Sequence, residues 1–214
     1  MGADSYLRAV RLLDRPAVLQ VRGLTPPGAG EDDATPACAA EAPAQLVVSV
    51  HGDGLGPAHL AAATHVARRV FGTDIDLAPL APVAAADPVF AAVAERFRGL
   101  RPVLIADPFE TLIWAILGQQ INVRFAAKLK RALVERYGVR VPWSRADGPT
   151  PADDPGGVPS DLLLFPDPET LSGLSHERDL RPLQFSRQKS EYTVLAARAI
   201  AGGALDLDAV AAAG

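Results

Sequence analysis

Apolar and polar residues follow a helical period most clearly between residues 107 and 138. One apolar stripe comprises Phe109, Leu112, Ile113, Ile116 and Leu117, and a second comprises Phe125, Leu129, Leu133 and Tyr137. Residues three or four positions apart share one face of an α-helix, so each stripe predicts a helix with one buried face. The rest of the chain is organised around this helix pair.

Capping signals set the ends of these two helices. Asp107 is suited to cap the first helix, with Pro108 at its first position, and Asn122 is suited to cap the second. Gly118 weakens the end of the first helix, and Gly138 stops the second. The short connector between the helices consists of Gln119, Gln120 and Ile121.

Upstream, the pattern predicts a small sheet. Residues 6–23 contain two β-rich runs separated by a turn, and residues 46–51 form a third run. Residues 60–71 then repeat at helical spacing. Strands followed by one helix predict an α+β domain over residues 1–80, and a low-complexity loop rich in Pro, Gly, Ala and acidic residues interrupts it at residues 25–45.

Residues 51–57, HGDGLGP, connect the third strand to that helix. Glycines allow backbone N–H groups to approach an anion, so a phosphate-binding loop is one interpretation. The segment matches no complete nucleotide-binding motif, however, and a strand-to-helix turn is the preferred interpretation.

From residue 81 to residue 214 we predict a helical domain without further strands, which makes the fold class α+β. Asp87, Asp167 and Ser186 each precede a helical run, and the run after Ser186 extends over residues 187–201. The stripe expected to face the core in this long helix comprises Tyr192, Leu195, Ala196 and Ala199.

A connection rich in Pro, Gly and Asp spans residues 139–161 of the predicted helical domain. Trp143 is the large apolar residue in it. We expect Trp143 to anchor this connection to the core.

Composition excludes several classes of site. The only cysteine, Cys38, permits no internal disulfide, no Cys-rich zinc site and no four-cysteine iron–sulfur cluster. His51, His59 and His65 do not have metal-ligand spacing, so we expect neither a metal nor a cofactor. No apolar run reaches the length of a membrane span and no signal-peptide pattern is present, which favours a cytoplasmic protein without a membrane partner.

Positive charge is concentrated in the central helix pair. Residues 108–138 carry five Lys and Arg against two Glu, a net charge of +3, whereas the whole chain carries −4. Arg124, Lys128 and Arg131 lie on one side of the second helix. Such a concentration is expected of a surface that meets a polyanion, but from the charge pattern alone a solvated helix face is the preferred interpretation.

The run FETLIWAILGQQINVRFAAKLKRALVERYG resembles the 3-methyladenine DNA glycosylase II family, the alkylation-repair branch of the helix-hairpin-helix glycosylase superfamily. Its I-L-G-Q-Q-I segment followed by A-A-K-L carries the resemblance. The similarity continues through FPDPETLSGLS, SRQKSEYTVLAARAIAGGALDL, FGTDIDL and DPVFAAVAERFRGLRP. It covers the chain from about residue 6 onward, except for the low-complexity loop.

This resemblance implies an N-terminal sheet domain lacking its first strands, followed by a helical glycosylase domain. It also implies hydrolysis of the N-glycosidic bond of alkylated purines in double-stranded DNA after base flipping. The expected setting is the bacterial cytoplasm, in association with the nucleoid. No cofactor and no obligate protein partner are expected.

Excision of a flipped base requires a side chain that fills the gap in the duplex, an aromatic-lined pocket and a carboxylate that stabilises the sugar cation. By resemblance the gap-filling role falls on Gln120, where well-known members carry an apolar residue, with Gln119 and Ile121 beside it; a simple helix-end connector is the alternative. Candidate pocket residues, each of which could equally belong to the core, are Phe109, Trp114 and Phe125. Candidate phosphate contacts are Arg124, Lys128, Arg187 and Lys189.

The family's G-x-G hairpin and essential Asp follow a segment that corresponds to LDL, near the end of this sequence. We therefore assign no catalytic residue within the chain, expect the family's Asp beyond Gly214, and expect little catalysis from these residues alone. Asp107, Asp167 and Asp179 are interpreted as helix caps. Apolar faces that the last helices leave uncovered are expected to cause aggregation or oligomerisation.

Two other functions fit the sequence. The chain could be a non-catalytic DNA-binding remnant or part of an alkylation-response transcription regulator, or an unrelated helical domain that binds a partner protein. Which alkylated bases would be excised does not follow from the sequence.

Overall fold

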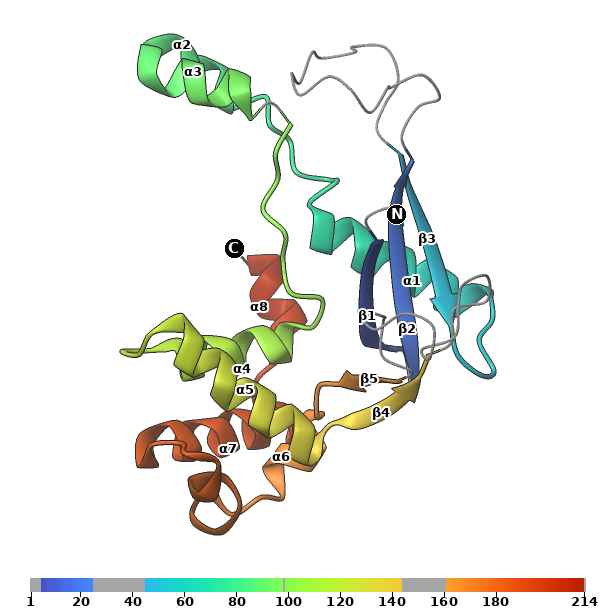
Figure 1. The fold of residues 1–214 in the computed structure, drawn as a ribbon, viewed down its shortest axis with the longest axis vertical. Helices are drawn as coiled ribbons and strands as arrows, with labels where there is room; N and C mark the ends of the chain where they lie inside the picture. Colours follow the sequence, from blue (N-terminus) through green and yellow to red (C-terminus); the bar gives the residue numbers. More distant parts are fainter. Residues whose placement is uncertain (1–4, 25–44, 98, 144–160, 214) are drawn as a thin grey trace, which may run out of the picture.

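The structure, a computed structural model, describes residues 5–24, 45–97, 99–143 and 161–213. A small antiparallel sheet with one covering helix lies beside a helical unit, and a hairpin of two short helices projects from the body on two extended segments (Figure 1). The predicted α+β class is confirmed. Residues 25–44 of the predicted low-complexity loop lie outside the described residues, and its last residue, Gln45, belongs to a strand. The predicted boundary at residue 80 stays a prediction.

The sheet has the order β1-β2-β3, formed by β1 (Ser5–Leu12), β2 (Arg15–Leu24) and β3 (Gln45–His51), with both pairings antiparallel. Helix α1 (Pro57–Phe71) packs on one face of the sheet. The core between them consists of alternate strand residues and one helix stripe, including Val10, Leu12, Leu19, Val21, Ala63, Ala67 and Val70. Residues 52–56 connect β3 to α1, which confirms the strand-to-helix turn.

The helical unit is built on α4 (Pro108–Gly118), α5 (Val123–Tyr137) and α7 (Arg187–Ala201). Shorter pieces complete it: α6 (Pro168–Ser172), a π-helical turn (His176–Leu180), a 3₁₀ turn (Arg181–Leu183) and α8 (Leu207–Ala213). The predicted caps are confirmed, since Asp107, Asn122, Asp167 and Ser186 each accept a hydrogen bond from a backbone N–H in the first turn. The two predicted stripes form its core, with Ile113, Leu117 and Leu133 fully buried.

The prediction of no strand after residue 81 is wrong. Strands β4 (Val139–Pro142) and β5 (Asp161–Leu164) pair antiparallel and pack against the sheet face opposite α1. Each is only four residues long, too short for a periodic signal. Trp143 is 6% exposed and meets the His51 ring edge-on, with 4.7 Å between centroids, so its anchoring role is confirmed. A Cβ on Gly138 would lie 2.6 Å from the Leu164 carbonyl, so a glycine is needed where α5 meets this hairpin.

The predicted core face of α7 is wrong for its two large residues, although Ala196 does pack against the core. Tyr192 and Leu195 are 44% and 57% exposed. The buried side chains are instead the smaller Ser190, Thr193, Val194 and Ala197. Small residues allow close packing of helices, and the Ser190 hydroxyl is satisfied by donating to backbone oxygens of its own helix, so burial of this polar residue costs little.

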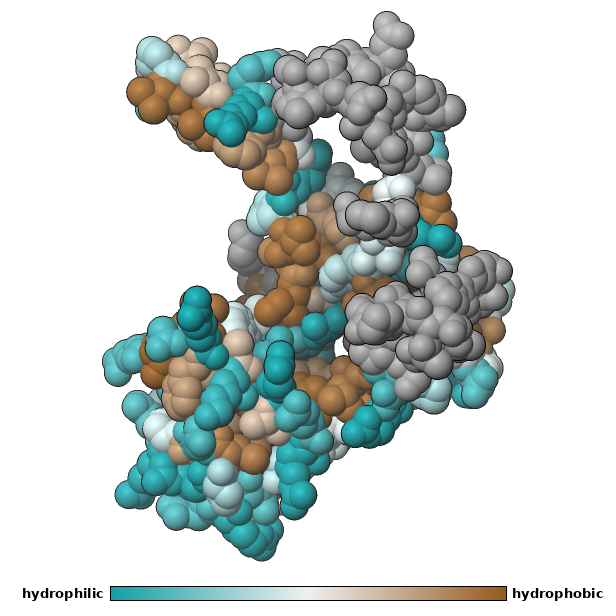
Figure 2. Space-filling model, in the orientation of Figure 1, coloured by the Kyte–Doolittle hydropathy of each residue, from teal (hydrophilic) through white to brown (hydrophobic). Residues whose placement is uncertain are grey.

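The projecting hairpin consists of α2 (Leu80–Ala86), which the sequence pattern did not predict, and α3 (Pro88–Arg96). Neither helix has a buried residue. Figure 2 shows hydrophobic surface along this hairpin, to which exposed Val83, Val89 and Val93 contribute. Of the helices described, none combines the length and hydropathy needed to cross a membrane.

Candidate nucleic-acid interface

The connector between α4 and α5 is a tight turn at the end of the helical unit remote from the sheet (Figure 1). Helix α4 ends when Gln119 takes an extended conformation, with φ −63° and ψ 128°. Gln120 then adopts φ +57°, in the left-handed region, and Asn122 caps α5 through a 2.8 Å hydrogen bond from the Phe125 N–H. The predicted bend between two helices is therefore present.

The turn separates the three side chains predicted to enter DNA. Gln119 and Gln120 are exposed, whereas Ile121 is half-buried and packs against the helical core. Few non-glycine residues adopt positive φ, and those that do often occupy functional sites. Of the three residues, Gln120 thus combines exposure with an unusual backbone conformation.

Gly118 leaves open space beside the turn. A Cβ built on it would meet no atom within 4 Å, and its φ is not positive, so neither the fold nor the backbone requires a glycine there. The absent side chain lets a surface from outside the chain approach the backbone at the end of α4.

Lys189 reaches this turn from α7. Its Nζ donates to the carbonyl oxygens of Ile116 at 3.0 Å, Leu117 at 2.8 Å and Gln119 at 2.7 Å. An ammonium group has three donors, and all three are used. In this arrangement its protons satisfy the unpaired carbonyls at the end of α4 and leave no donor for the predicted phosphate contact.

The other predicted phosphate contacts remain exposed. Arg124 makes no hydrogen bond or ion pair with another described residue, and Lys128 donates to Gln184 Oε1 at 3.1 Å on the surface. Arg187 pairs with Glu191 at 2.9 Å within α7, with 77% of its side chain exposed. These three cations can accordingly approach a polyanion without breaking a buried contact.

Part of the positive charge counted in the sequence is not available at the surface. The Lys130 ammonium and the Arg8 guanidinium both pair with Glu110, which is 2% exposed. This cluster around the buried Glu110 joins β1 to α4 and α5, and so connects the sheet to the helical unit. Cavities of about 900 Å³ and 500 Å³ both touch Arg8 and Glu110.

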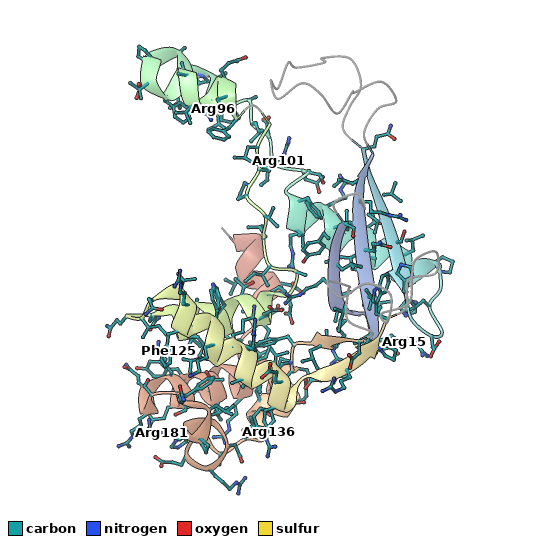
Figure 3. All side chains as sticks on the ribbon, in the orientation of Figure 1. Arg15, Arg96, Arg101, Phe125, Arg136 and Arg181 are labelled. Carbon is teal, nitrogen blue, oxygen red and sulfur yellow. The ribbon has the colours of Figure 1, made fainter. Side chains whose placement is uncertain are left out.

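The predicted aromatic pocket is not assembled. Phe109 is 4% exposed and packs edge-on against Phe165, with ring centroids 6.0 Å apart, so it is a core residue. Phe125 is half-buried and packs against the same core from α5 (Figure 3). Trp114 lines the 500 Å³ cavity, where the Lys130 ammonium lies 5.3 Å from its ring centroid. Phe109 and Phe125 therefore share one core, whereas Trp114 lies beside Lys130, and the three rings do not line a common pocket.

Asp107 and Asp167 cap helices as predicted, whereas the prediction for Asp179 is wrong, because Ser175 is the cap and Asp179 lies within the π-helical turn. Asp107 Oδ1 accepts from the Phe109 N–H at 2.8 Å, Asp167 Oδ1 from the Thr170 N–H at 2.9 Å, and Asp179 Oδ2 from the Ser175 N–H at 2.8 Å. Burial raises the pKa of the Asp107 carboxyl, while Arg11 and the cap hydrogen bonds outweigh burial and lower the pKa of Asp167. Within the described segments, no three His, Cys, Asp or Glu residues gather as a metal site.

The sequence identified the turn and the nearby cations, but it did not show which of these cations are free and which are already bound within the protein. The pairing of Lys130 with Glu110, which distinguishes it from Arg124 and Lys128, had only a weak signal in the sequence: a glutamate on the preceding helix. The contact of Lys189 had none, because about seventy residues separate it from the turn.

Comparison with known proteins agrees with this arrangement. Residues 113–212 match the family model described as HhH-GPD superfamily base excision DNA repair protein. A DNA-3-methyladenine glycosylase of Bacillus subtilis is 36% identical over 135 residues, 63% of this chain and 40% of that protein. The chain thus spans less than half the length of this relative.

Solved structures share the fold. A 3-methyladenine DNA glycosylase from Archaeoglobus fulgidus superposes with a TM-score of 0.64 at 21% identity, covering 91% of this chain and 55% of that one. The Clostridium acetobutylicum 8-oxoguanine glycosylase/lyase in complex with DNA gives 0.58 at 15% identity, with 96% and 55% coverage. Over residues 113–212, in its helical unit, the chain is thus similar to the HhH-GPD superfamily of base excision DNA repair proteins.

Proposed function

We propose that this chain is the damage-recognising portion of a DNA glycosylase that excises alkylated purines of the 3-methyladenine type. The observation that carries the proposal is exposed Gln120, held at positive φ on a tight turn between two packed helices. The 36% identity to the Bacillus glycosylase supports the substrate class.

Gln120 enters the duplex where the damaged nucleotide leaves it. Extrusion of a nucleotide costs a few kcal/mol of unstacking, and a group that fills the gap offsets part of that cost. The glutamine amide both donates and accepts hydrogen bonds, so it can pair with the orphaned base as well as occupy space. Because the turn joins packed helices, the side chain is presented on a rigid support.

Arg124, Lys128 and Arg187 contact the phosphates on either side of this point. All three are exposed and lie on α5 or at the start of α7. Each phosphate neutralised releases counterions and adds about −0.9 to the slope of log K against log salt. These contacts hold the duplex in register without reading its sequence.

Hydrolysis of the N-glycosidic bond passes through a cation-like sugar that a carboxylate stabilises. Asp107, Asp167 and Asp179 are occupied with backbone N–H groups at helix starts. We assign no catalytic residue among the described positions, and expect the 214-residue polypeptide to bind damaged DNA with little release of base.

The test compares duplexes by fluorescence anisotropy: one with an abasic-site analogue, one with 3-methyladenine or its stable isostere, and one intact. We expect tighter binding to the two damaged duplexes. Gln120→Ala should reduce the preference for abasic over intact DNA about tenfold, equivalent to about 1.4 kcal/mol. Gln120→Leu should retain most of it, because leucine also fills the gap. Gln45→Ala, at an exposed position of β3, is the matched control.

Three outcomes separate the alternatives. Equal affinity for damaged and intact duplexes would favour a transcription regulator. Failure of the folded protein to bind any duplex at low salt would favour a protein-interaction domain. Rapid release of 3-methyladenine would support the glycosylase and show that a carboxylate within residues 1–214 is catalytic.

A further inference from the structure

Lys189 lies in a position that its own helix does not favour. It is the third residue of α7, after the Ser186 cap, where its cation faces the positive end of the α7 dipole. Burial lowers the pKa of its ammonium, so the charged form also loses hydration. Neither the helix nor the solvent accounts for a lysine here, and the reason lies in what the ammonium contacts.

Those contacts are at the negative end of α4. The carbonyls of Ile116, Leu117 and Gln119 lack intrahelical partners because the helix stops at Gly118. A cation at a helix C-terminus is favourable, and three charge-assisted hydrogen bonds fix its place. Lys189 thereby joins the start of α7 to the end of α4.

The hydrogen bond to the Gln119 carbonyl is the one that affects the turn. That carbonyl belongs to the peptide plane whose nitrogen is the Gln120 N–H. Holding the plane at 2.7 Å from Nζ restricts rotation about the Gln120 N–Cα bond and so maintains its φ of +57°. Positive φ is disfavoured for glutamine, and without the contact the residue would relax toward negative φ and redirect its side chain.

We propose that Lys189 is a positioning residue that holds the α4–α5 turn in the conformation in which Gln120 enters DNA. The proposal deepens the proposed function and rests on it for the role of Gln120. This role excludes a phosphate contact by Lys189. To bind the ammonium, a phosphate would have to displace the carbonyl oxygens, and the turn would be released.

The test distinguishes a positioning role from a phosphate contact. Lys189→Met preserves the approximate length of the side chain and removes its hydrogen-bond donors. We expect it to lower the preference for abasic over intact duplex about tenfold while the salt slope stays as in the wild type. The matched control is Lys128→Met on α5, where loss of a phosphate contact should reduce the salt slope by about 0.9 and leave the preference unchanged.

Two further measurements keep the proposal testable if Lys189→Met is unstable. Lys189→Arg retains a cation and should restore part of the preference. In a Gln120→Gly background, where φ is no longer costly and the wedge side chain is absent, Lys189→Met should cause no further loss of preference.

A loss of salt slope in Lys189→Met with the preference intact would overturn the proposal and restore the phosphate contact. If the wild type shows no preference for abasic DNA, the proposed function fails and a separate readout decides the role of Lys189. In ¹⁵N NMR spectra, Lys189→Met should shift the Gln120 backbone amide and Lys128→Met should not. An unchanged Gln120 amide would refute the positioning role.

Discussion

Helices α4 and α5 form a connected pair, as do α2 and α3, yet only the first pair is built into a core. Ile113, Leu117 and Leu133 of α4 and α5 are fully buried, whereas α2 and α3 have no buried residue and Val89 is 77% exposed. Both α3 and α4 begin with an aspartate that caps the first turn and a proline after it. Capping therefore defines where a helix begins in both pairs, but tertiary packing distinguishes them.

This difference matters for what each pair can present. The turn between α4 and α5 exposes polar side chains on a packed support, so their positions are maintained. The hairpin of α2 and α3 exposes an apolar face that nothing in the described structure covers (Figure 2). An exposed apolar face of this kind can drive self-association. The oligomerisation predicted from the sequence was expected from the last helices, not from this hairpin, and it stays a prediction.

The largest expected effect comes from breaking the packed pair. Leu133→Ala should destabilise the protein by about 2–5 kcal/mol, because Leu133 is fully buried in the helical core and its loss leaves a cavity. Val93→Ala on α3, at a side chain that is 47% exposed, should change stability by less than about 0.5 kcal/mol. Urea unfolding followed by circular dichroism measures both, and equal losses would show that α3 is packed in solution.

A smaller effect is expected from removing one cap in each pair. Asn122→Ala removes the acceptor of the Phe125 N–H and should lower global stability by about 1 kcal/mol, because α5 unfolds with the core. Asp87→Ala removes the acceptor of the Val89 and Phe90 N–H groups and should fray α3 alone.

Hydrogen exchange distinguishes these two outcomes. Asp87→Ala should speed exchange of amides in α3 without a change in the melting temperature, and Asn122→Ala should lower the melting temperature. If Asp87→Ala lowered the melting temperature by the same amount, the hairpin would be part of the cooperative unit.

The smallest expected effect concerns Asp107, whose pKa is raised by burial and by the nearby charge of Glu110. Because the folded pKa exceeds the unfolded value of 3.8, the wild type loses stability as pH rises from 3.8 through the folded pKa. Asp107→Asn keeps a capping acceptor and cannot ionise. It should match the wild type or fall slightly below it at pH 3.5 and exceed it at pH 7, as measured by thermal melts across this range.

Asp107→Ala provides the control for that comparison, since it removes both the charge and the cap. It should be less stable than Asp107→Asn at each pH. A stability difference between Asp107→Asn and the wild type that does not change with pH would contradict the assigned cause.

Helix α7 shows which features can be predicted from the sequence and which cannot. Its limits were predicted correctly from Ser186 and the glycines after Ala201, because capping and chain termination are local properties. Its buried face was not, since Tyr192 and Leu195 are larger and more apolar than the Ser190 and Thr193 that are buried. Close packing against neighbouring helices selected small side chains over apolar ones, and that choice depends on the neighbours.

By itself, the sequence determined the helix ends, the bend at residues 118–122 and the two apolar stripes, because hydrophobic period and capping chemistry act within a few residues. Only the tertiary structure decided that Lys130 is withdrawn into a pair with Glu110, that Phe109 belongs to the core, and that Lys189 holds the turn. A charged side chain pairs with whichever acceptor the fold brings near it, and for Lys189 that acceptor lies 70 residues away in the sequence.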